Sequence, residues 1–446
     1  MLPPPPPPPH SIRKGRKGLS ADALFALVRR RFAGIPDPRQ PEPAIPLVDV
    51  LMSAFAMFIL KDPSLLAFDG RRNDANLKAI FGIGQIPCDT SMRKSLDPIV
   101  PEQFRSAFGD VFRQLQRGKV LERFQFLGGY LVSLDGTGYF SSEKVHCESC
   151  QVKKHKNGTV TYQHQMLAAV IMHPDLKEVI PLTPEPIQKP DGSTKNDCER
   201  NAARRWLQKI RRQHPHLKLI VVEDGLASNA PHVRDLKLYG MHFLLGVKPG
   251  DHPFLFNEVE RARQEGCSPW LTRKEHGITT QASWVWDVPL NESNQDLRVN
   301  FLEYQEYDAK GKCLRHFTWI TDFHITHRNA WTLASGGRSR WHIENETFNT
   351  LKNQGYHFEH NYGHGQQNLS VVFAMLMMLA FLVDQTQQLC CPLFRAVLGR
   401  LGNKRSLWEL QRSHFYHFLF HSMRQLYEAI LFDRCKEIPW PGLDSS

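Results

Sequence analysis

The sequence predicts an α/β protein in which helices flank a mixed β-sheet, with a helical region before the sheet and an antiparallel β insertion within it. Three observations lead to this prediction. Helical apolar spacing dominates as far as about residue 126. Short β-branched strands and amphipathic helices then alternate, as is typical of sheets with helices on their faces. Antiparallel strand patterns occupy residues 278–325 and interrupt that alternation.

The N-terminal part divides into an arm and a set of helices. Residues 1–20 are rich in proline and then in glycine, lysine and arginine, so we expect a disordered arm. Residues 21–126 form a helical N-terminal domain in this interpretation, and Ser20 is a suitable N-cap for its first helix. The predicted helices are Ser20–Arg31, Val48–Ile59, Ser91–Leu96 and Pro101–Leu121.

The main domain is predicted to span residues 127–440, with strands and helices in the order βββαβαβ. Its first helix, Asp197–Gln213, repeats apolar residues at i, i+3, i+4 and i+7, and Asp197 can cap it. The second predicted helix is Asn229–Leu238. The predicted strands are Gly129–Leu134, Gln165–Met172, Lys177–Leu182, Lys218–Val222 and Met241–Val247.

The β insertion is expected at residues 251–330. Alternating residues predict the strands Gln281–Val288, Asp296–Tyr307 and Leu314–Thr321, with a turn at Asp308–Gly311. Helical spacing then returns in Arg340–Asn353 and in the long apolar stretch Asn368–Gln388.

The charge of the chain favours a polyanionic partner. The formal net charge is +11, and residues 1–34 carry seven Lys and Arg residues against one Asp. Such an excess suits nucleic acid or an anionic membrane surface, although a merely basic soluble protein has the same signature. The apolar run Val371–Val383 is too short to span a bilayer, and no apolar leader follows the N-terminal prolines. With nine cysteines and no export signal, we expect a reducing cytoplasm and no membrane.

Two aspartates are the first candidates for a functional site. Asp135 and Asp224 each follow an apolar strand and precede a glycine, so we expect both to face a crevice. Two ionised carboxylates that lie close together repel each other, and a divalent cation relieves the repulsion. Oxygen ligands favour Mg²⁺ or Mn²⁺, and two such ions support phosphoryl transfer. The alternative for either residue is a loop-capping aspartate.

A third carboxylate is expected in the helix Arg340–Asn353, which offers Glu344 and Glu346. At about 100° per residue, Glu346 points about 200° away from Glu344. Arg340 precedes Glu344 by four residues and shares its face, whereas Lys352 lies about 80° round the helix. We therefore choose Glu344 as the third acid, with Arg340 and Lys352 beside it for phosphate contacts, and keep Glu346 as the alternative. A surface Arg–Glu pair would have the same spacing.

From about Ile86 to Gly365 the chain resembles bacterial insertion-sequence transposases of the DDE type. The stretches that carry the resemblance are Ser133–Thr137, Lys195–Ala202, Glu223–Asn229, Gly246–His252, Trp341–Glu346 and Asn353–Tyr356. The resemblance implies a ribonuclease H-like catalytic domain with a β insertion before the final acid.

By this resemblance, Asp135, Asp224 and Glu344 correspond to the three metal-binding acids of the family, and Arg340 and Lys352 to the basic residues around the last one. Two departures concern the family signature. It has six residues between its Glu and Lys, where this chain has seven, and its leading Tyr falls at Gly337. These departures keep Glu346 open as the third acid and leave Lys352 less secure.

The function expected is cleavage and strand transfer at the ends of an insertion sequence, with two Mg²⁺ or Mn²⁺ ions per site. The partners would be double-stranded DNA, as element ends and target, and a second copy of the chain on that DNA. The helical N-terminal domain would recognise the element ends, and in a bacterium the bound protein would be nucleoid-associated. The alternatives are a transposase-derived DNA-binding protein without activity and a metal-dependent nuclease.

Cys147 and Cys150 form a C-x-x-C motif with His146 adjacent and His155 nearby. Zinc prefers four such ligands, and the nearest other cysteine is Cys198, so a zinc site would need distant partners. We assign no role to His164, His360 and His364. We expect core positions for Trp284, Trp286 and Trp319, and favourable charge at a helix C-terminus for Lys209, Arg211 and Arg212.

Overall fold

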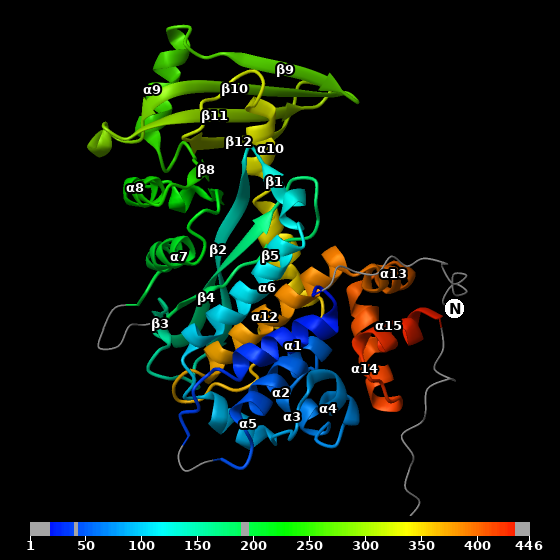
Figure 1. The fold of residues 1–446 in the computed structure, drawn as a ribbon. Helices are drawn as coiled ribbons and strands as arrows, with labels where there is room; N and C mark the ends of the chain where they lie inside the picture. The colour runs from blue at the N-terminus through cyan, green and yellow to red at the C-terminus, as the bar shows by residue number, and fades with distance from the viewer. Residues whose placement is uncertain (1–17, 40–42, 189–195, 433–446) are drawn as a thin grey trace, which may run out of the picture.

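The computed structural model describes residues 18–39, 43–188 and 196–432. Most of the predicted arm 1–20 and residue Lys195 lie outside these ranges. Within them, twelve strands join one mixed sheet flanked by helices, which confirms the predicted α/β class (Figure 1). The main path through the sheet runs in the order β3 (Gln151–Lys154), β4 (Val160–Met172), β2 (Gly129–Ser142), β7 (Leu219–Glu223), β8 (His242–Gly246), β12 (Cys313–Thr321), β11 (Arg298–Tyr307), β10 (Ile278–Pro289) and β9 (Trp270–Glu275).

The central strands pair in both senses. β2 is antiparallel to β4 and parallel to β7, and β7 is parallel to β8. The prediction that the first strand ends at Leu134 was wrong: β2 continues to Ser142 because β4 pairs with it over that length. Of the predicted strand Lys177–Leu182, only β5 (Ile180–Pro181) is present. β5, β6 (Glu185–Ile187) and β1 (Gln125–Phe126) pair at the margins of β4 and β2.

The β insertion continues the same sheet. β12 pairs antiparallel with β8, with Ile320 opposite Leu245, and β11, β10 and β9 follow outward from it. The three predicted strands correspond to β10, β11 and β12, and the turn at Asp308 is closed by a 3.0 Å bond from the Gly311 N–H. β9 and the preceding helix α9 (Pro253–Gln264) were not predicted. In Figure 1 the insertion forms the upper part of the molecule.

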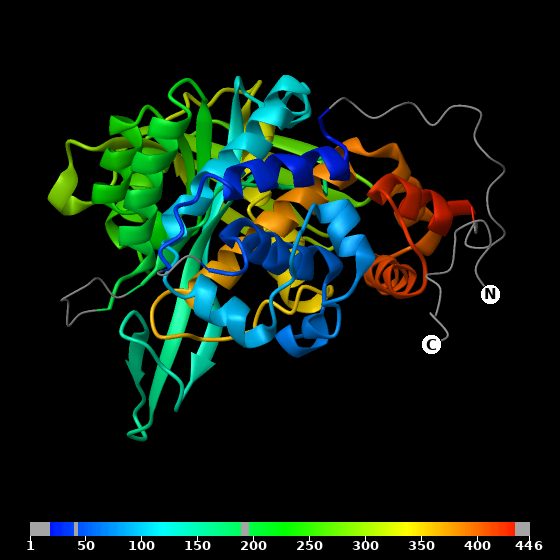
Figure 2. The same ribbon diagram turned by 60° about the horizontal axis from the view of Figure 1, so that its bottom comes forward.

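The N-terminal helices share one hydrophobic core with the C-terminal helices. Figure 2 shows α1 and α2 lying beside α12 and the last two helices. A buried ion pair of 2.6 Å joins Lys61, after α2, to Asp384 of α12. The Ser20 cap is confirmed by its bond from the Ala23 N–H. The helices are α1 (Ala21–Phe32), α2 (Leu47–Leu60), α3 (Leu65–Asp69), α4 (Ala75–Phe81), α5 (Asp89–Leu96), η1 (Pro101–Phe104), α6 (Arg105–Arg117), η2 (Leu121–Phe124), α12 (Leu369–Cys390), α13 (Pro392–Leu401), α14 (Lys404–His417) and α15 (Met423–Phe432).

Helix α12 is the most apolar element. It matches the predicted helix Asn368–Gln388 closely, and by length and composition alone its 22 residues are enough to cross a membrane. The apolar window of α12 is entirely buried inside the protein. It therefore has the surroundings of a core helix, which is compatible with the expected absence of a membrane.

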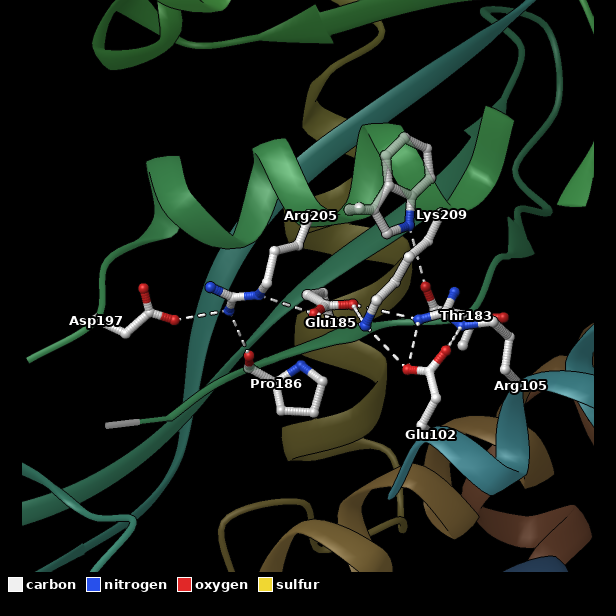
Figure 3. A network of polar contacts seen from close by, with 9 residues as sticks. Glu102, Arg105, Thr183, Glu185, Pro186, Asp197, Arg205 and Lys209 are labelled. Carbon is white, nitrogen blue, oxygen red and sulfur yellow. Dashed lines mark hydrogen bonds and ion pairs between the residues drawn. The ribbon is translucent and has the colours of Figure 1, made fainter. Parts of the chain in front are cut away.

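Helices α7 (Glu199–Gln213) and α8 (Ala230–Leu238) lie to the other side of β2 and β4 from α12 in Figure 1. A network of polar contacts fixes α7 against β6 and α6 (Figure 3). At its centre the carboxylate of Glu185, 3% exposed, accepts bonds from Arg105, Arg205 and Lys209. Because one buried acid holds three cations from two helices, it fixes α7 against α6 and β6.

Candidate active site

Asp135 and Asp224 stand at the same level of the sheet. The parallel pairing of β2 and β7 ends with Ser133 opposite Val222, and each aspartate lies two residues farther along its chain. The prediction that Asp135 lies at the end of a strand was wrong, because Asp135 is within the β2–β4 ladder, opposite Ala168. Asp224 directly follows β7, and one of its carboxylate oxygens accepts from the Leu226 N–H at 3.0 Å. The capping role considered for Asp224 is thus present and occupies one oxygen.

The segment with Glu344 is not the regular α-helix expected for Arg340–Asn353. After α10 (Ala330–Arg338), a π-helical turn, η5 (Ile343–Phe348), precedes α11 (Asn349–Asn353). The Asn349 N–H donates to the Glu344 carbonyl five residues earlier. Angles counted at about 100° per residue therefore do not hold beyond Glu344. Single π-helical turns are rare and frequently mark functional sites.

Arg340 connects two of the three acids. Its guanidinium donates to Glu344 within its own segment and lies 3.4 Å from the Asp135 carboxylate on β2. The prediction that Arg340 and Glu344 share a face is confirmed. This pair differs from an isolated surface ion pair, because Arg340 also contacts Asp135 on β2.

Glu346 and Lys352 are not drawn into the same group. Burial lowers the pKa of the Lys404 amine at the start of α14, and the charge of Glu346 opposes that shift, so Glu346 acts on α14. The Lys352 amine lies 2.8 Å from the carboxylate of Glu359. The structure therefore groups Asp135, Asp224, Glu344 and Arg340, and it pairs Lys352 with a different acid.

The site concentrates negative charge. The pKa of Asp135 is raised from 3.8 to about 6, mainly by burial; the charge of Arg340 lowers it, and the charges of Glu199, Asp224 and Glu344 add to the rise. Burial also raises the pKa of Glu199, with Asp224 and Glu223 adding to the effect. These mutual effects place four carboxylates in one neighbourhood. A divalent cation would relieve their repulsion.

Glu199 is a site residue that the sequence reasoning missed. It is the first residue of α7 and lies over β2, where a side chain on Gly136 would collide with its carboxylate. A side chain at position 136 would therefore displace the Glu199 carboxylate from its place beside Asp135. The acidic residues of Asp197–Glu199 mark the start of α7 in the sequence, and the prediction made Asp197 its N-cap. The N-cap is Cys198, and Asp197 instead binds Arg205 at 2.6 Å.

A cleft of about 700 Å³ opens between the carboxylates and the β insertion. Asp224, Glu344 and Arg340 line one side of it. The other lining residues include three cations and three aromatic side chains, namely Lys248, Arg315, Arg338, Phe317, Trp319 and Trp341. Basic residues interleaved with aromatic rings can hold a phosphate backbone and stack on bases. Trp341, 42% exposed, was not singled out from the sequence.

The tryptophans of the insertion occupy core positions, as expected. Trp284 is fully buried, and Trp286 donates its indole N–H to the Ile325 carbonyl at 2.8 Å. Trp319 is 4% exposed and packs on Gly337, where a Cβ would lie 2.5 Å from the indole. The position of the family's leading Tyr therefore has no room for a side chain.

The basic residues at the end of α7 serve the fold. Arg211 donates to the His214, Pro215 and Leu217 carbonyls, which confirms its expected place at the helix C-terminus. Lys209 instead binds the acids Glu102 and Glu185.

A second cluster of chemically reactive groups lies apart from the carboxylates. Cys147 and Cys150 contact His164 of β4 and His364 of the segment before α12, and all four side chains are buried. Of the neighbours considered from the sequence, His146 stacks on Tyr162, His155 contacts Thr161, and Cys198 is exposed. His164 and His364, to which the sequence analysis assigns no role, complete this cluster.

The carboxylate site combines acids, cations and an open cleft. Asp135, Asp224, Glu344 and Glu199 supply the hard oxygen donors that Mg²⁺ and Mn²⁺ prefer. Burial is the main cause of the raised pKa values of Asp135 and Glu199, and the neighbouring carboxylates add to both; a divalent cation would offset both effects. No protein-family model matches the chain, and no curated protein is significantly similar to it.

Proposed function

We propose that the chain is a DNA transposase that cleaves and joins DNA ends at the site formed by Asp135, Asp224 and Glu344. The observation that carries the proposal is the convergence of these acids, which lie far apart in the sequence, around Arg340. Their order and surroundings match the resemblance to the DDE transposases. A ribonuclease H-like fold is part of the proposal and is supported by a central strand paired antiparallel on one side and parallel on the other.

The acids would hold two Mg²⁺ or Mn²⁺ ions. Bound there, two such ions supply Lewis-acid activation of a water or hydroxyl and stabilise a leaving oxygen. Glu199 adds a fourth carboxylate next to Asp135 and Asp224, so the site offers enough oxygens for two coordination shells. Arg340 holds Asp135 and Glu344 in place and, being part-exposed, can also contact a phosphate.

The cleft would hold the DNA. Lys248 lines this cleft, as do Arg315 and Arg338, which each form a 2.8 Å ion pair with Glu306, and Trp341 offers an exposed ring at the same opening. Phosphate contacts give affinity, whereas an aromatic platform accepts an unstacked base. The proposed substrate is double-stranded DNA, as element ends and target, bound by two copies of the chain.

Lys352 differs from Arg340 in its partner, because it pairs with Glu359 and not with an acid of the proposed site. A π-helical turn holds one residue more than an α-helical turn. The turn between Glu344 and Lys352 therefore absorbs the extra residue by which this spacing exceeds that of the family. Lys352 can serve DNA only after its ion pair with Glu359 opens.

The test is transposition of a selectable marker flanked by the DNA that borders the coding sequence. We expect Asp135→Asn, Asp224→Asn and Glu344→Gln to abolish Mg²⁺-dependent cleavage and joining. Glu346→Gln is the matched control and is expected to retain both activities, because Glu346 is not among the charges that act on Asp135, whereas its charge acts on Lys404. Retained activity in any one of the first three variants removes that residue from the site.

The products separate the alternative functions. Cleaved ends without joined products indicate a nuclease. DNA binding without cleavage in the wild-type chain indicates a DNA-binding protein of transposase origin. Either result overturns the proposed transposase.

A further inference from the structure

The Cys147, Cys150, His164 and His364 cluster brings together three segments of the chain. The cysteines follow β2, His164 lies within β4, and His364 lies 214 residues after Cys150, just before α12. The sulfur atoms are 3.8 Å apart, His164 Nε2 is 3.4 Å from each sulfur, and His364 Nε2 is 3.5 Å from Cys150 Sγ. All four donor atoms lie within 4.8 Å of one another.

These separations are those of a tetrahedral metal site. Zinc bonds of about 2.3 Å to sulfur and about 2.05 Å to nitrogen give tetrahedral edges of about 3.8 Å between two sulfurs and about 3.6 Å between sulfur and nitrogen. The observed sulfur–sulfur distance is 3.8 Å, and the sulfur–nitrogen contacts are 3.4–3.5 Å. A disulfide requires about 2.05 Å between the sulfurs, so the present arrangement suits a shared ion better than a cystine.

The surroundings of the cluster exclude water. Cys150 and His164 are each 1% exposed, and Cys147 and His364 are at most 9% exposed. Tyr139 and Phe140 of β2 pack their rings on the two imidazoles. Among the described residues, neither imidazole Nδ1 has a hydrogen-bond partner, so the Nε2 atoms that face the sulfurs make the polar contacts of both rings. A buried set of two cysteine sulfurs and two imidazole nitrogens is typical of a structural zinc site.

We propose that Cys147, Cys150, His164 and His364 bind one Zn²⁺ ion as a structural Cys₂His₂ site. Binding replaces the two thiol protons, which pass to solvent, and involves no change of oxidation state. The bound ion fastens the segment before α12 to the β2–β4 pair. It thereby connects the strand that carries Asp135 with the chain that follows Glu344, and this link is independent of the transposase proposal.

The first experiment measures metal in the full-length chain purified under reducing conditions. We expect one zinc per chain by elemental analysis, and a thiolate-to-cobalt absorption band when Co²⁺ is added after zinc is stripped with a chelator. Absence of both zinc and the cobalt band in the wild-type chain overturns the proposal. So does a Cys147–Cys150 disulfide found by mass spectrometry in the reduced preparation.

Variants test the ligand set. Cys147→Ser and His364→Ala are expected to lower zinc content to background, whereas Cys267→Ser, at an exposed cysteine, retains one zinc per chain. If the first two variants do not fold, X-ray absorption of the wild-type chain decides, because two sulfur and two nitrogen neighbours are expected around zinc. Any other donor set, or zinc retained in both ligand variants, contradicts the assignment.

Discussion

Asp135→Asn should stabilise the metal-free protein while abolishing its proposed activity. Burial raises the pKa of the Asp135 carboxyl to about 6 from 3.8, so the folded state binds its proton more tightly than the unfolded state does. Ionised Asp135 therefore costs stability above pH 6, and the difference in pKa corresponds to about 3 kcal/mol. That figure is an upper bound, since the side chain is 26% exposed and solvent screens its charge.

The assay is urea denaturation of both proteins across a pH series with a chelator of divalent ions present. Wild type should lose stability relative to the Asn variant as pH rises from about 4 to about 6. The advantage of the variant should be absent below pH 4 and complete above pH 6. Added Mg²⁺ should then stabilise the wild type more than the variant, because the ion binds only the ionised site.

Two results would refute this reasoning. Equal stability of the two proteins at pH 7.5 would show that the carboxylate repulsion inferred around Asp135 is absent. A variant advantage that persists unchanged at pH 4 would show that it arises from packing and not from charge.

Further predictions concern the support of the site. Glu185→Ala should lower the free energy of unfolding by about 1–3 kcal/mol, because it removes the buried acceptor shared by Arg105, Arg205 and Lys209, which keep only their ion pairs with Glu102 and Asp197. Glu102→Ala, at a half-exposed acid, should cost under about 1 kcal/mol in the same urea titration. Gly337→Ala should cost about 1–3 kcal/mol by overpacking against the indole, while Gly399→Ala, which meets open space, should not destabilise in thermal melts. Burial lowers the pKa of His214 to about 4, so stability should fall as pH drops from 6.5 to 4, and His214→Gln should flatten that part of the pH profile.

Local sequence signals predicted the central strands of the sheet and three strands of its insertion, but not β1, β3, β6 or β9. Alternation over residues 281–321 identified β10, β11 and β12, since these strands pair with neighbours in the chain. The length of β2 was underestimated, because Asp135 and the glycines after it look like a strand end in isolation. Only the pairing with β4, which is distant in sequence, shows that the strand continues.

The sequence grouped four residues of the candidate carboxylate site. It did not identify Glu199 in that site or His364 in the separate cysteine–histidine cluster. Asp135, Asp224, Glu344 and Arg340 were identified because strand ends and helical spacing are short-range features. Glu199 was missed, since its contact with the site depends on how α7 is held over β2. His364 was likewise invisible beside the C-x-x-C motif, because 214 residues separate it from Cys150.

The unbroken hydrogen bonding from β8 into β12 joins two walls of the cleft in one sheet: the wall with Asp224 and Val247, and the wall with Phe317 and Trp319. The segment with Arg340 and Glu344 lines the cleft beside them. The two walls in the sheet cannot hinge apart without tearing a ladder of backbone bonds, and several ladder bonds would have to open together. If DNA binds in this cleft as proposed, it would contact a rigid surface whose width does not change. Bending, unstacking or unpairing would then fall to the nucleic acid, so sequences that deform easily would be preferred as substrates.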